Sequence, residues 1–197
     1  MLKVKQMNCG RLQASNISIG KGKIAALSGP SGSGKSVFLK ALADLIPWKG
    51  QVELDGVSSL VVPAFRWREL VTYVSANTVW WSDKVASHMY SHPKMEEWLS
   101  GLGLEFDILY QEPTKLSTGQ QQRLALLRAL CRNPRVVLLD EPTSNLDSDN
   151  VIRVEKLISQ WVFNNRTVVF TSHDKSQVAR FSDLQWYIDG KQVREIQ

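Results

Sequence analysis

The sequence contains no long run of apolar residues. Its longest unbroken runs extend over only a few residues, such as Val136 to Leu139, whereas a helix that crosses a lipid bilayer needs about 20. The stretch from Met1 to Lys5 also lacks the apolar core of a secretion signal. We therefore expect a chain that does not span a membrane by itself and that resides in the cytoplasm.

Cysteine is scarce, and blocks of like charge are absent. Cys9 and Cys131 are the two cysteines, which suggests no disulfide framework and fits a reducing compartment. The net charge of +5 comes from scattered Lys and Arg residues. Such a balance is compatible with nucleic acid or with an anionic membrane surface, but without a basic block we expect no nucleic-acid partner.

Apolar residues make up 43% of the 197 residues, which suffices for the core of one packed domain. Alternating or continuous apolar segments predict strands at 2–6, 15–19, 24–28, 51–54, 136–139, 167–171, 184–188 and 192–196. Apolar stripes at helical spacing predict helices over 37–46, ended by Pro47, and over 120–132 and 151–161. This alternation favours an α/β fold with a mostly parallel sheet.

A glycine-rich loop follows the predicted strand 24–28. Its residues match the pattern GxxxxGK followed by Ser or Thr, and they are Gly29, Pro30, Ser31, Gly32, Ser33, Gly34, Lys35 and Ser36. In such a loop the glycines let backbone N–H groups turn toward a phosphate, and the following helix adds partial positive charge. We expect Lys35 to contact the β- and γ-phosphates of ATP and the Ser36 hydroxyl to ligate Mg²⁺.

Two carboxylates end the apolar strand 136–139. Asp140 and Glu141 would lie at the carboxyl edge of a parallel sheet, where ligands bind in such folds. We expect Asp140 to hold Mg²⁺ through water and Glu141 to polarise the attacking water. A pair of acids at a strand end is weak evidence alone, but coupled to the phosphate loop it predicts an ATPase.

Three further segments narrow this class to one family. Residues 116–120 read Leu-Ser-Thr-Gly-Gln and resemble the LSGGQ signature of ABC ATPases, with Thr118 at the first glycine. Residues 142–147 resemble the PTSALD D-loop of that family, and residues 171–174 resemble its TSHD segment, which carries the switch histidine. The order and spacing of these motifs match the family over nearly the whole chain.

The resemblance implies a P-loop NTPase core with a mostly parallel sheet, a small antiparallel β subdomain and a compact helical subdomain. It implies one domain over 1–197, with the helical subdomain inserted at about 77–120. Two copies would pack head to tail with ATP between them. One copy would supply the phosphate loop, Asp140, Glu141 and His173, and the other would supply Ser117, Gly119 and Gln120. The catalytic residues would be Glu141, His173 and Lys35, with His173 contacting the γ-phosphate and orienting Glu141.

The function that the resemblance implies is that of an ATP-binding subunit of a membrane transporter. Such a subunit hydrolyses ATP to ADP and phosphate on the inner face of the cell membrane, bound to separate permease chains. The alternative is a regulatory or non-transport ABC ATPase whose ATP-dependent dimerisation acts as a switch. Repair members of the family carry a long coiled coil before the signature, and ribosomal members carry two ABC domains; this chain has neither.

Two positions depart from the family pattern. The aromatic residue that usually stacks on adenine aligns with Cys9, which predicts weak adenine selectivity unless Arg11 or another group covers the base. The glutamine of the YVPQ segment is replaced by Ala76, although Asn77 follows and offers a shorter amide. That glutamine normally contacts Mg²⁺ and the attacking water, so we expect slow basal hydrolysis; ordinary turnover, with water filling the gap, is the alternative.

Tryptophan is concentrated before the signature, at Trp67, Trp80, Trp81 and Trp98. Because tryptophan is enriched at interface hot spots, one interpretation is that Trp80 and Trp81 line the groove that receives the permease. The other is that they fill the core of a small subdomain. His88 and His92 are four residues apart, but with no third ligand nearby we do not expect a metal there.

Overall fold

The computed structural model describes residues 1–196 as one α/β unit. The strands are β1 (Leu2–Cys9), β2 (Leu12–Ile19), β3 (Ile24–Ser28), β4 (Lys49–Leu54), β5 (Val57–Ser58), β6 (Val71–Val74), β7 (Val136–Leu139), β8 (Thr167–Thr171), β9 (Leu184–Asp189) and β10 (Gln192–Ile196). The α-helices are α1 (Lys35–Leu42), α2 (Ala64–Leu70), α3 (Met95–Gly101), α4 (Thr118–Cys131), α5 (Ser148–Val162) and α6 (Lys175–Phe181). Short 3-10 helices are η1 (Ser59–Val61), η2 (Val85–His88), η3 (Phe106–Tyr110) and η4 (Pro113–Lys115).

All ten strands join one sheet in the order β5-β4-β1-β2-β10-β9-β3-β8-β7-β6. The pairs from β9 through β3, β8 and β7 to β6 are parallel, whereas β2, β1, β4 and β5 pair antiparallel. The three predicted strands 24–28, 136–139 and 167–171 are confirmed with the same bounds. Parallel pairing brings the carboxyl ends of β3, β7 and β8 to the same edge.

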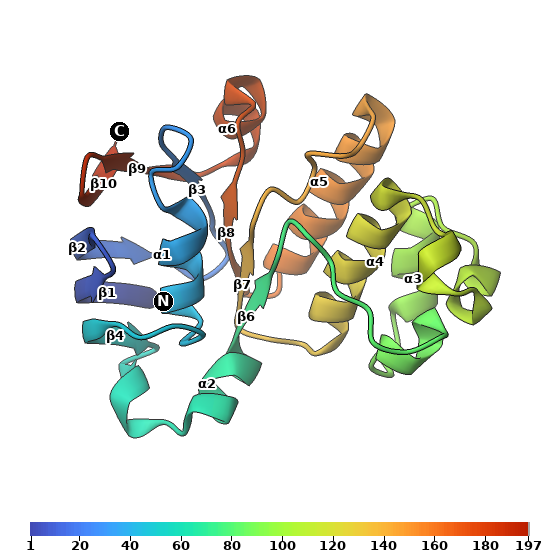
Figure 1. Cartoon of the computed structure of the whole chain (residues 1–197), viewed down its shortest axis with the longest axis horizontal. Helices are drawn as coiled ribbons and strands as arrows, with labels where there is room; N and C mark the ends of the chain where they lie inside the picture. Colours follow the sequence, from blue (N-terminus) through green and yellow to red (C-terminus); the bar gives the residue numbers. More distant parts are fainter. Residues whose placement is uncertain (197) are drawn as a thin grey trace.

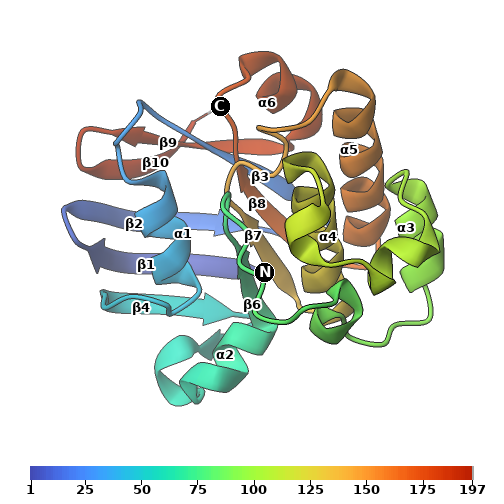
Figure 2. The same cartoon turned by 45° about the vertical axis from the view of Figure 1, so that its right-hand side comes forward.

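The parallel strands are buried on both faces. Along β7, Val136 and Leu138 belong to a core shared with α1 and the antiparallel strands, whereas Val137 and Leu139 belong to a core shared with α3, α4 and α5. Figures 1 and 2 show these helices on opposite sides of the parallel strands. This two-faced burial explains why these strands read as continuous apolar runs.

The first two strands are longer than predicted and form a tight hairpin. Cys9 pairs with Leu12, so only Gly10 and Arg11 make the turn. The predicted first strand, 2–6, was too short because β1 has a register shift between Val4 and Gln6 in its pairing with β4. The shift places two exposed residues in succession and interrupts the period of two.

Helix α1 is shorter than predicted and ends before Pro47. Asp44 adopts a φ of 56°, its N–H donates to Ala41 O over 3.0 Å, and the N–H of Leu45 donates to Lys40 O over 2.9 Å. These are the two hydrogen bonds of a Schellman motif, with Asp in the left-handed position that glycine usually takes. The helix was therefore predicted too long, because the residue that ends it is Asp44 rather than the glycine that usually marks such an end.

Between β6 and β7 the chain builds α3 and α4, which flank one face of the sheet together with the later helix α5. Trp98 of α3 is buried there, together with residues of α4 and α5. Trp67 lies elsewhere: it is fully buried against α1, and its indole N–H donates to Leu42 O over 2.9 Å. No helix among residues 1–196 combines the length and apolarity that crossing a bilayer requires.

Gly50 allows β4 to pass close to the irregular part of β1, which generates a stability prediction. Its φ is 130°, and a Cβ there would lie 2.1 Å from the carbonyl oxygen of Gln6. We expect Gly50→Ala to lower the free energy of unfolding by about 2 kcal/mol or more, because backbone has to shift. Denaturant unfolding measures this effect.

The matched control for that substitution is Gly101→Ala. Gly101 ends α3, and a Cβ there would have no heavy atom within 4 Å. We expect its unfolding midpoint to stay at that of the unaltered chain or to rise slightly. Equal midpoints for the Gly50 and Gly101 variants would contradict the close approach at Gly50.

Candidate functional site

The phosphate loop connects β3 to α1. Gly29, Gly32 and Gly34 have φ angles of 151°, 70° and 105°, which glycine adopts without strain. A Cβ on Gly34 would lie 2.8 Å from Leu12 Cδ1, so packing as well as conformation excludes a side chain there. Because α1 begins at Lys35, its unpaired first N–H groups and its dipole favour an anion at this point.

Lys35 holds a positive charge inside the loop. The residue is 7% exposed, and its Nζ donates to the carbonyl oxygens of Gly29 over 3.0 Å and Pro30 over 3.2 Å. No carboxylate pairs with it among the ion pairs of residues 1–196. A buried ammonium with only carbonyl partners is suited to an incoming anion.

Three serines occupy different depths of the loop. Ser31 is exposed at the tip, and Ser36 is half-buried in the first turn of α1. The hydroxyl of Ser33 is buried and has no hydrogen-bond partner within residues 1–196. An orphaned hydroxyl in the same loop as a buried ammonium fits the oxygen-rich ligand that this loop was predicted to hold.

Asp140 lies at the carboxyl end of β7, and both of its carboxylate oxygens accept hydrogen bonds. Thr171 donates its hydroxyl to Oδ1 over 2.9 Å, and Tyr73 donates its hydroxyl to Oδ2 over 2.9 Å. Burial, followed by the charge of Asp140, raises the pKa of Tyr73 above its ordinary value, so the phenol keeps its proton. The remaining lone pairs of the carboxylate can accept from water, which fits Mg²⁺ held through water.

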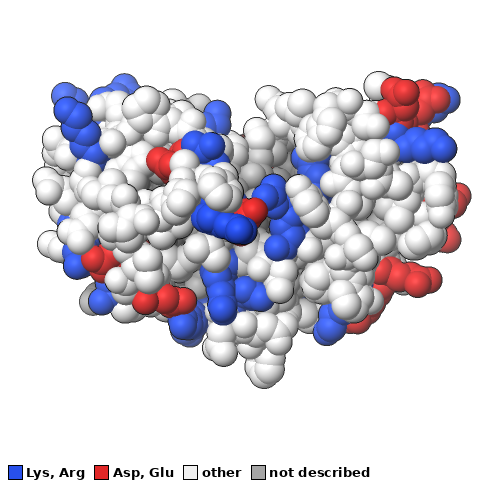
Figure 3. All heavy atoms as spheres, turned by 90° about the horizontal axis from the view of Figure 1, so that it is seen from below, with Lys and Arg blue, Asp and Glu red and all other residues white. Residues whose placement is uncertain are grey.

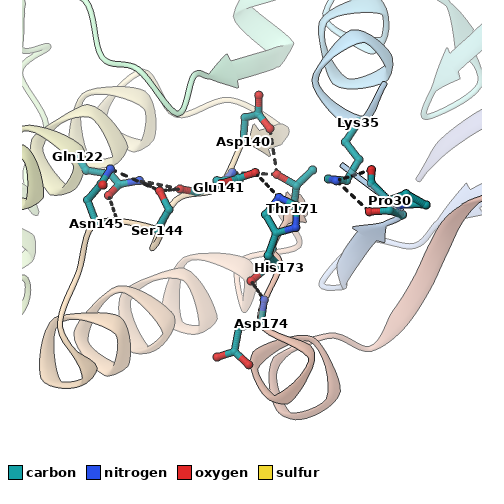
Figure 4. Close-up of polar contacts among 12 residues, drawn as sticks. Pro30, Lys35, Gln122, Asp140, Glu141, Ser144, Asn145, Thr171, His173 and Asp174 are labelled. Carbon is teal, nitrogen blue, oxygen red and sulfur yellow. Dashed lines mark hydrogen bonds and ion pairs between the residues drawn. The ribbon is translucent and has the colours of Figure 1, made fainter. Parts of the chain in front are cut away.

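Glu141 faces His173 across the carboxyl edge of the sheet. Its Oε1 lies 2.8 Å from His173 Nε2, and the two elements that carry them are the ends of β7 and β8 (Figure 4). Both residues line a pocket of about 340 Å³, together with Thr143, Ser144, Leu146, Val151, Ser172, Asp174 and Gln177. The structure therefore brings together the acid and the histidine that the sequence placed 32 residues apart.

The signature segment begins α4 with a capping box. Ser117 Oγ accepts from the N–H of Gln120 over 3.2 Å, and Gln120 Oε1 accepts from the N–H of Ser117 over 2.9 Å. Gly119 packs against the D-loop, since a Cβ there would lie 3.2 Å from Asn145 O. No hydrogen bond within residues 1–196 joins 117–120 to the phosphate loop of the same chain.

Three residues of this site had no predicted role. Tyr73 and Thr171 bind Asp140, and Gln122 of α4 donates to Glu141 O over 2.6 Å. Tyr73 and Thr171 lie within the motif segments themselves, so only their contacts were missing from the sequence. Gln122 is buried on a helix whose apolar stripe gives no sign that one glutamine points inward.

The expected adenine position is corrected by the hairpin. Cys9 is 1% exposed and packs in the core, and burial raises the pKa of its thiol to about 11. It therefore cannot face a base. Arg11, in the turn that follows, is exposed and donates from its guanidinium to Gly32 O of the phosphate loop. The two-residue turn explains both positions. Because the strand continues through Cys9, that residue stays in the core, and Arg11 in the turn contacts the phosphate loop.

The segment after β6 lines a groove beside α4. Asn77 borders this groove with Tyr90, Arg128 and Arg132, whereas Glu141 and His173 line the separate pocket described above. Trp81 is 71% exposed in the groove, and Trp80 packs inward against the second core. Trp80 thus contributes to the core, as one interpretation predicted, whereas Trp81 is exposed in the groove, and its contact with a permease stays a prediction.

Cations border this groove as well as aromatic rings. The guanidinium of Arg128 lies 4.8 Å from the ring centre of Trp80 and 5.1 Å from that of Trp81, and the guanidinium of Arg132 lies 5.0 Å from that of Tyr90. Figure 3 shows the molecule from below, with Lys and Arg side chains gathered next to a notch between its two halves. The groove is therefore both aromatic and basic.

The two histidines of the helical region have aromatic neighbours. His88 is buried, with ring centroids 4.9 Å from Trp80 and 4.4 Å from Trp81. His92 stacks on Trp98 with centroids 4.4 Å apart. Among residues 1–196 there is no group of three His, Cys, Asp or Glu side chains arranged to hold a metal ion.

Known proteins match both the sequence and the fold. The family model described as "ABC transporter" matches residues 12–144. The phosphate import ATP-binding protein PstB of Saccharolobus solfataricus is 35% identical over 85% of this chain and 74% of its own length. The phosphonates import ATP-binding protein PhnC of Trichormus variabilis is 31% identical over 96% of this chain and 86% of its own.

A longer relative and a solved structure also match this chain. ABC transporter B family member 1 of Dictyostelium discoideum is 30% identical over 91% of this chain, which spans 22% of that protein's length. The ATP-binding cassette MJ0796, in a dimeric post-hydrolysis state bound to ADP and Pi, has a TM-score of 0.84 at 26% identity and covers 100% of this chain. These matches identify the same family that the motifs resemble: the chain belongs to the ABC transporter family as one of its ATP-hydrolysing, ATP-binding domains.

Proposed function

We propose that this chain drives transport through a membrane-spanning partner by binding and hydrolysing ATP between two copies of itself. One observation carries the proposal. The phosphate loop, Asp140, Glu141 and His173 lie at the carboxyl ends of neighbouring strands, while Ser117 begins a helix on another part of the molecule. A second copy, turned head to tail, brings its own Ser117 to the exposed side of this site.

The phosphates of ATP are bound by the loop 29–36. Lys35 contacts the β- and γ-phosphates with the charge that its carbonyl partners leave uncompensated. The N–H groups at the start of α1 surround the β-phosphate, with Gly29, Gly32 and Gly34 leaving room for its oxygens. Arg11 lies against the same loop and is the residue that the base meets.

Hydrolysis depends on charge and position at the edge of the sheet. Ser36 and Asp140 hold Mg²⁺, which neutralises charge on the β- and γ-phosphates when it is bound. Glu141 polarises the attacking water and His173, 2.8 Å away, orients that carboxylate and reaches the γ-phosphate. Tyr73 and Thr171 each donate a hydrogen bond to the carboxylate of Asp140 and hold it in place.

The partner copy completes each site with its signature. Ser117 already accepts a hydrogen bond from Gln120, so its hydroxyl proton is free to be donated to the γ-phosphate of the opposite copy. Gly119 lets the backbone approach, and Gln120 holds the first turn of α4 through its bond to Ser117. The solved dimer of a similar cassette with ADP and Pi supports this arrangement.

The membrane partner docks in the groove beside α4. Trp81 supplies a large exposed aromatic surface, and Arg128 and Arg132 supply positive charge around it. A permease segment placed there contacts both the chain after β6 and the helix that carries the signature. With such a partner the subunit would lie against the inner face of the cell membrane, and the relatives named as import ATP-binding proteins support a transporter as the partner.

The first test separates ATP binding from hydrolysis. We expect Glu141→Gln to keep MgATP binding but to lower turnover by about 10²–10³-fold, because the water loses its polarising carboxylate. It should then accumulate as a dimer in MgATP, which light scattering after gel filtration measures. Lys35→Ala is the matched control and should neither bind ATP tightly nor dimerise. A Glu141→Gln chain that stays monomeric in saturating MgATP would refute the proposed dimer with ATP between the two copies.

The second test concerns the groove. We expect the tagged chain to recover a multi-spanning protein at near-equal stoichiometry from detergent-solubilised membranes of its own source, as mass spectrometry detects. Trp81→Ala should lower that recovery by about tenfold or more if the ring is an interface hot spot. Phe163→Ala is the control, since Phe163 is 89% exposed at the C-cap of α5 and is not among the residues that line the groove. Recovery of only soluble proteins or ribosomes would refute the transport function.

The third test concerns the missing glutamine. Ala76 is half-buried just beyond β6, and a glutamine there would extend an amide toward the attacking water and Mg²⁺. We expect Ala76→Gln to raise the steady-state rate of phosphate release by about tenfold, since positioning of the water limits turnover. Ala76→Leu, which adds bulk without an amide, should give no increase. If the two variants behave alike, slow hydrolysis does not originate at this position.

A further inference from the structure

Glu141 has an unusual backbone conformation. Its φ is 50°, in the left-handed region that residues other than glycine, Asn and Asp rarely adopt. Such a conformation persists at a functional site only where the surrounding structure holds it. The direction of the Glu141 carboxylate therefore depends on the groups that bind its peptide N–H and C=O.

Two elements hold this residue from opposite sides. Its N–H donates to Thr171 Oγ1 over 2.8 Å, at the end of β8. Its carbonyl oxygen accepts from Gln122 Nε2 of α4 over 2.6 Å and from Ser144 Oγ over 3.2 Å. Gln122 is 6% exposed, so its amide is bound in place rather than solvated (Figure 4).

The same amide also binds the next turn of the chain. Gln122 Oε1 accepts from the N–H of Asn145 over 3.4 Å, and its Nε2 lies 3.5 Å from Ser144 Oγ. One side chain of α4 thus holds both Glu141 and the D-loop that follows it. The first turn of α4 packs on this D-loop too, because a Cβ on Gly119 would lie 3.1 Å from Leu146 Cδ2.

We propose that Gln122 is a positioning residue that transmits the position of α4 to Glu141 and so couples the two ATP sites of the dimer. The proposal rests on the proposed function, in which Ser117 contacts the ATP bound by the partner copy. Ser117 caps α4, and Gln122 lies on the next turn of the same helix. Engagement of the partner's γ-phosphate by Ser117 therefore fixes, through Gln122, the acid that acts on this copy's own ATP.

The hydrogen-bond donor of Gln122 distinguishes this role from packing alone. Gln122→Glu keeps the shape of the side chain and the acceptor for Asn145, but it places a carboxylate oxygen where the amide donated to Glu141 O. Gln122→Leu fills the space without either bond. The matched control is Gln121→Leu, because the amide of Gln121 donates to Leu116 O over 3.0 Å and makes no hydrogen bond with Glu141 in the described part of the chain.

The experiment measures phosphate release by the full chain over a range of MgATP concentrations. We expect Gln122→Glu to lower kcat by about tenfold or more while KM for ATP changes by less than about twofold, because Lys35 and the phosphate loop are untouched. We also expect the Hill coefficient for ATP to fall from between about 1.5 and 2 toward 1. Gln121→Leu should retain both the rate and the cooperativity.

Each outcome decides the proposal. Gln122→Glu with unchanged kcat and Hill coefficient overturns it, and so does a lower kcat with full cooperativity, which would leave only a local effect on Glu141. If Gln122→Leu fails to fold, as circular dichroism would reveal, Gln122→Glu decides alone. A Glu141→Gln chain that forms no dimer in MgATP overturns the proposed function itself, whereas a dimer with unaltered Gln122→Glu kinetics overturns only the coupling.

Discussion

One hydroxyl group organises the acidic side of the ATP site. Thr171 Oγ1 donates to Asp140 and accepts from the N–H of Glu141, so the two acids of β7 are bound to the end of β8 through a single atom. The parallel register, in which Leu139 pairs with Phe170, brings the end of β8 beside the end of β7. Without this hydroxyl, the left-handed peptide of Glu141 would be held only through its carbonyl oxygen. The carboxylate of Asp140 would keep a single side-chain donor, Tyr73.

The opposite charges of the site are kept apart within one chain. Lys35 binds carbonyl oxygens on its side of the site, and the acids bind hydroxyl groups on theirs. Direct pairing of Lys35 with Asp140 would have neutralised both and left little for a phosphate or a metal ion to gain. The separation therefore leaves an ammonium for the phosphates of ATP on one side and a carboxylate for the Mg²⁺ that we propose on the other.

Much of this arrangement was predictable because the motifs are local. Strands 24–28, 136–139 and 167–171 are buried on both faces, and their continuous apolar runs set their bounds. Prediction failed where a backbone feature had no marker in the sequence: the register shift that interrupts the alternation of β1, the two-residue turn that leaves Cys9 inside β1 and in the core, and the stop at Asp44 without glycine. The partners of Glu141 were missed because long-range hydrogen bonds have no period.

Helix α4 connects the ATP site to the groove that we propose receives the membrane partner. Its fourteen residues, 118–131, span about 20 Å. One end carries Ser117 and Gln122 at the ATP site, and the other carries Arg128, with Ala125 and Ala129, in the aromatic groove. Arg123, the residue after Gln122, binds α4 to its neighbours by donating to Leu102 O at the end of α3 and to Asn150 Oδ1 of α5, over 2.6 Å each. Because these bonds tie α4 to its neighbours, we infer that a partner docked in the groove would act on Glu141 by moving α4 together with α3 and α5, and that ATP would act on the partner by the same route.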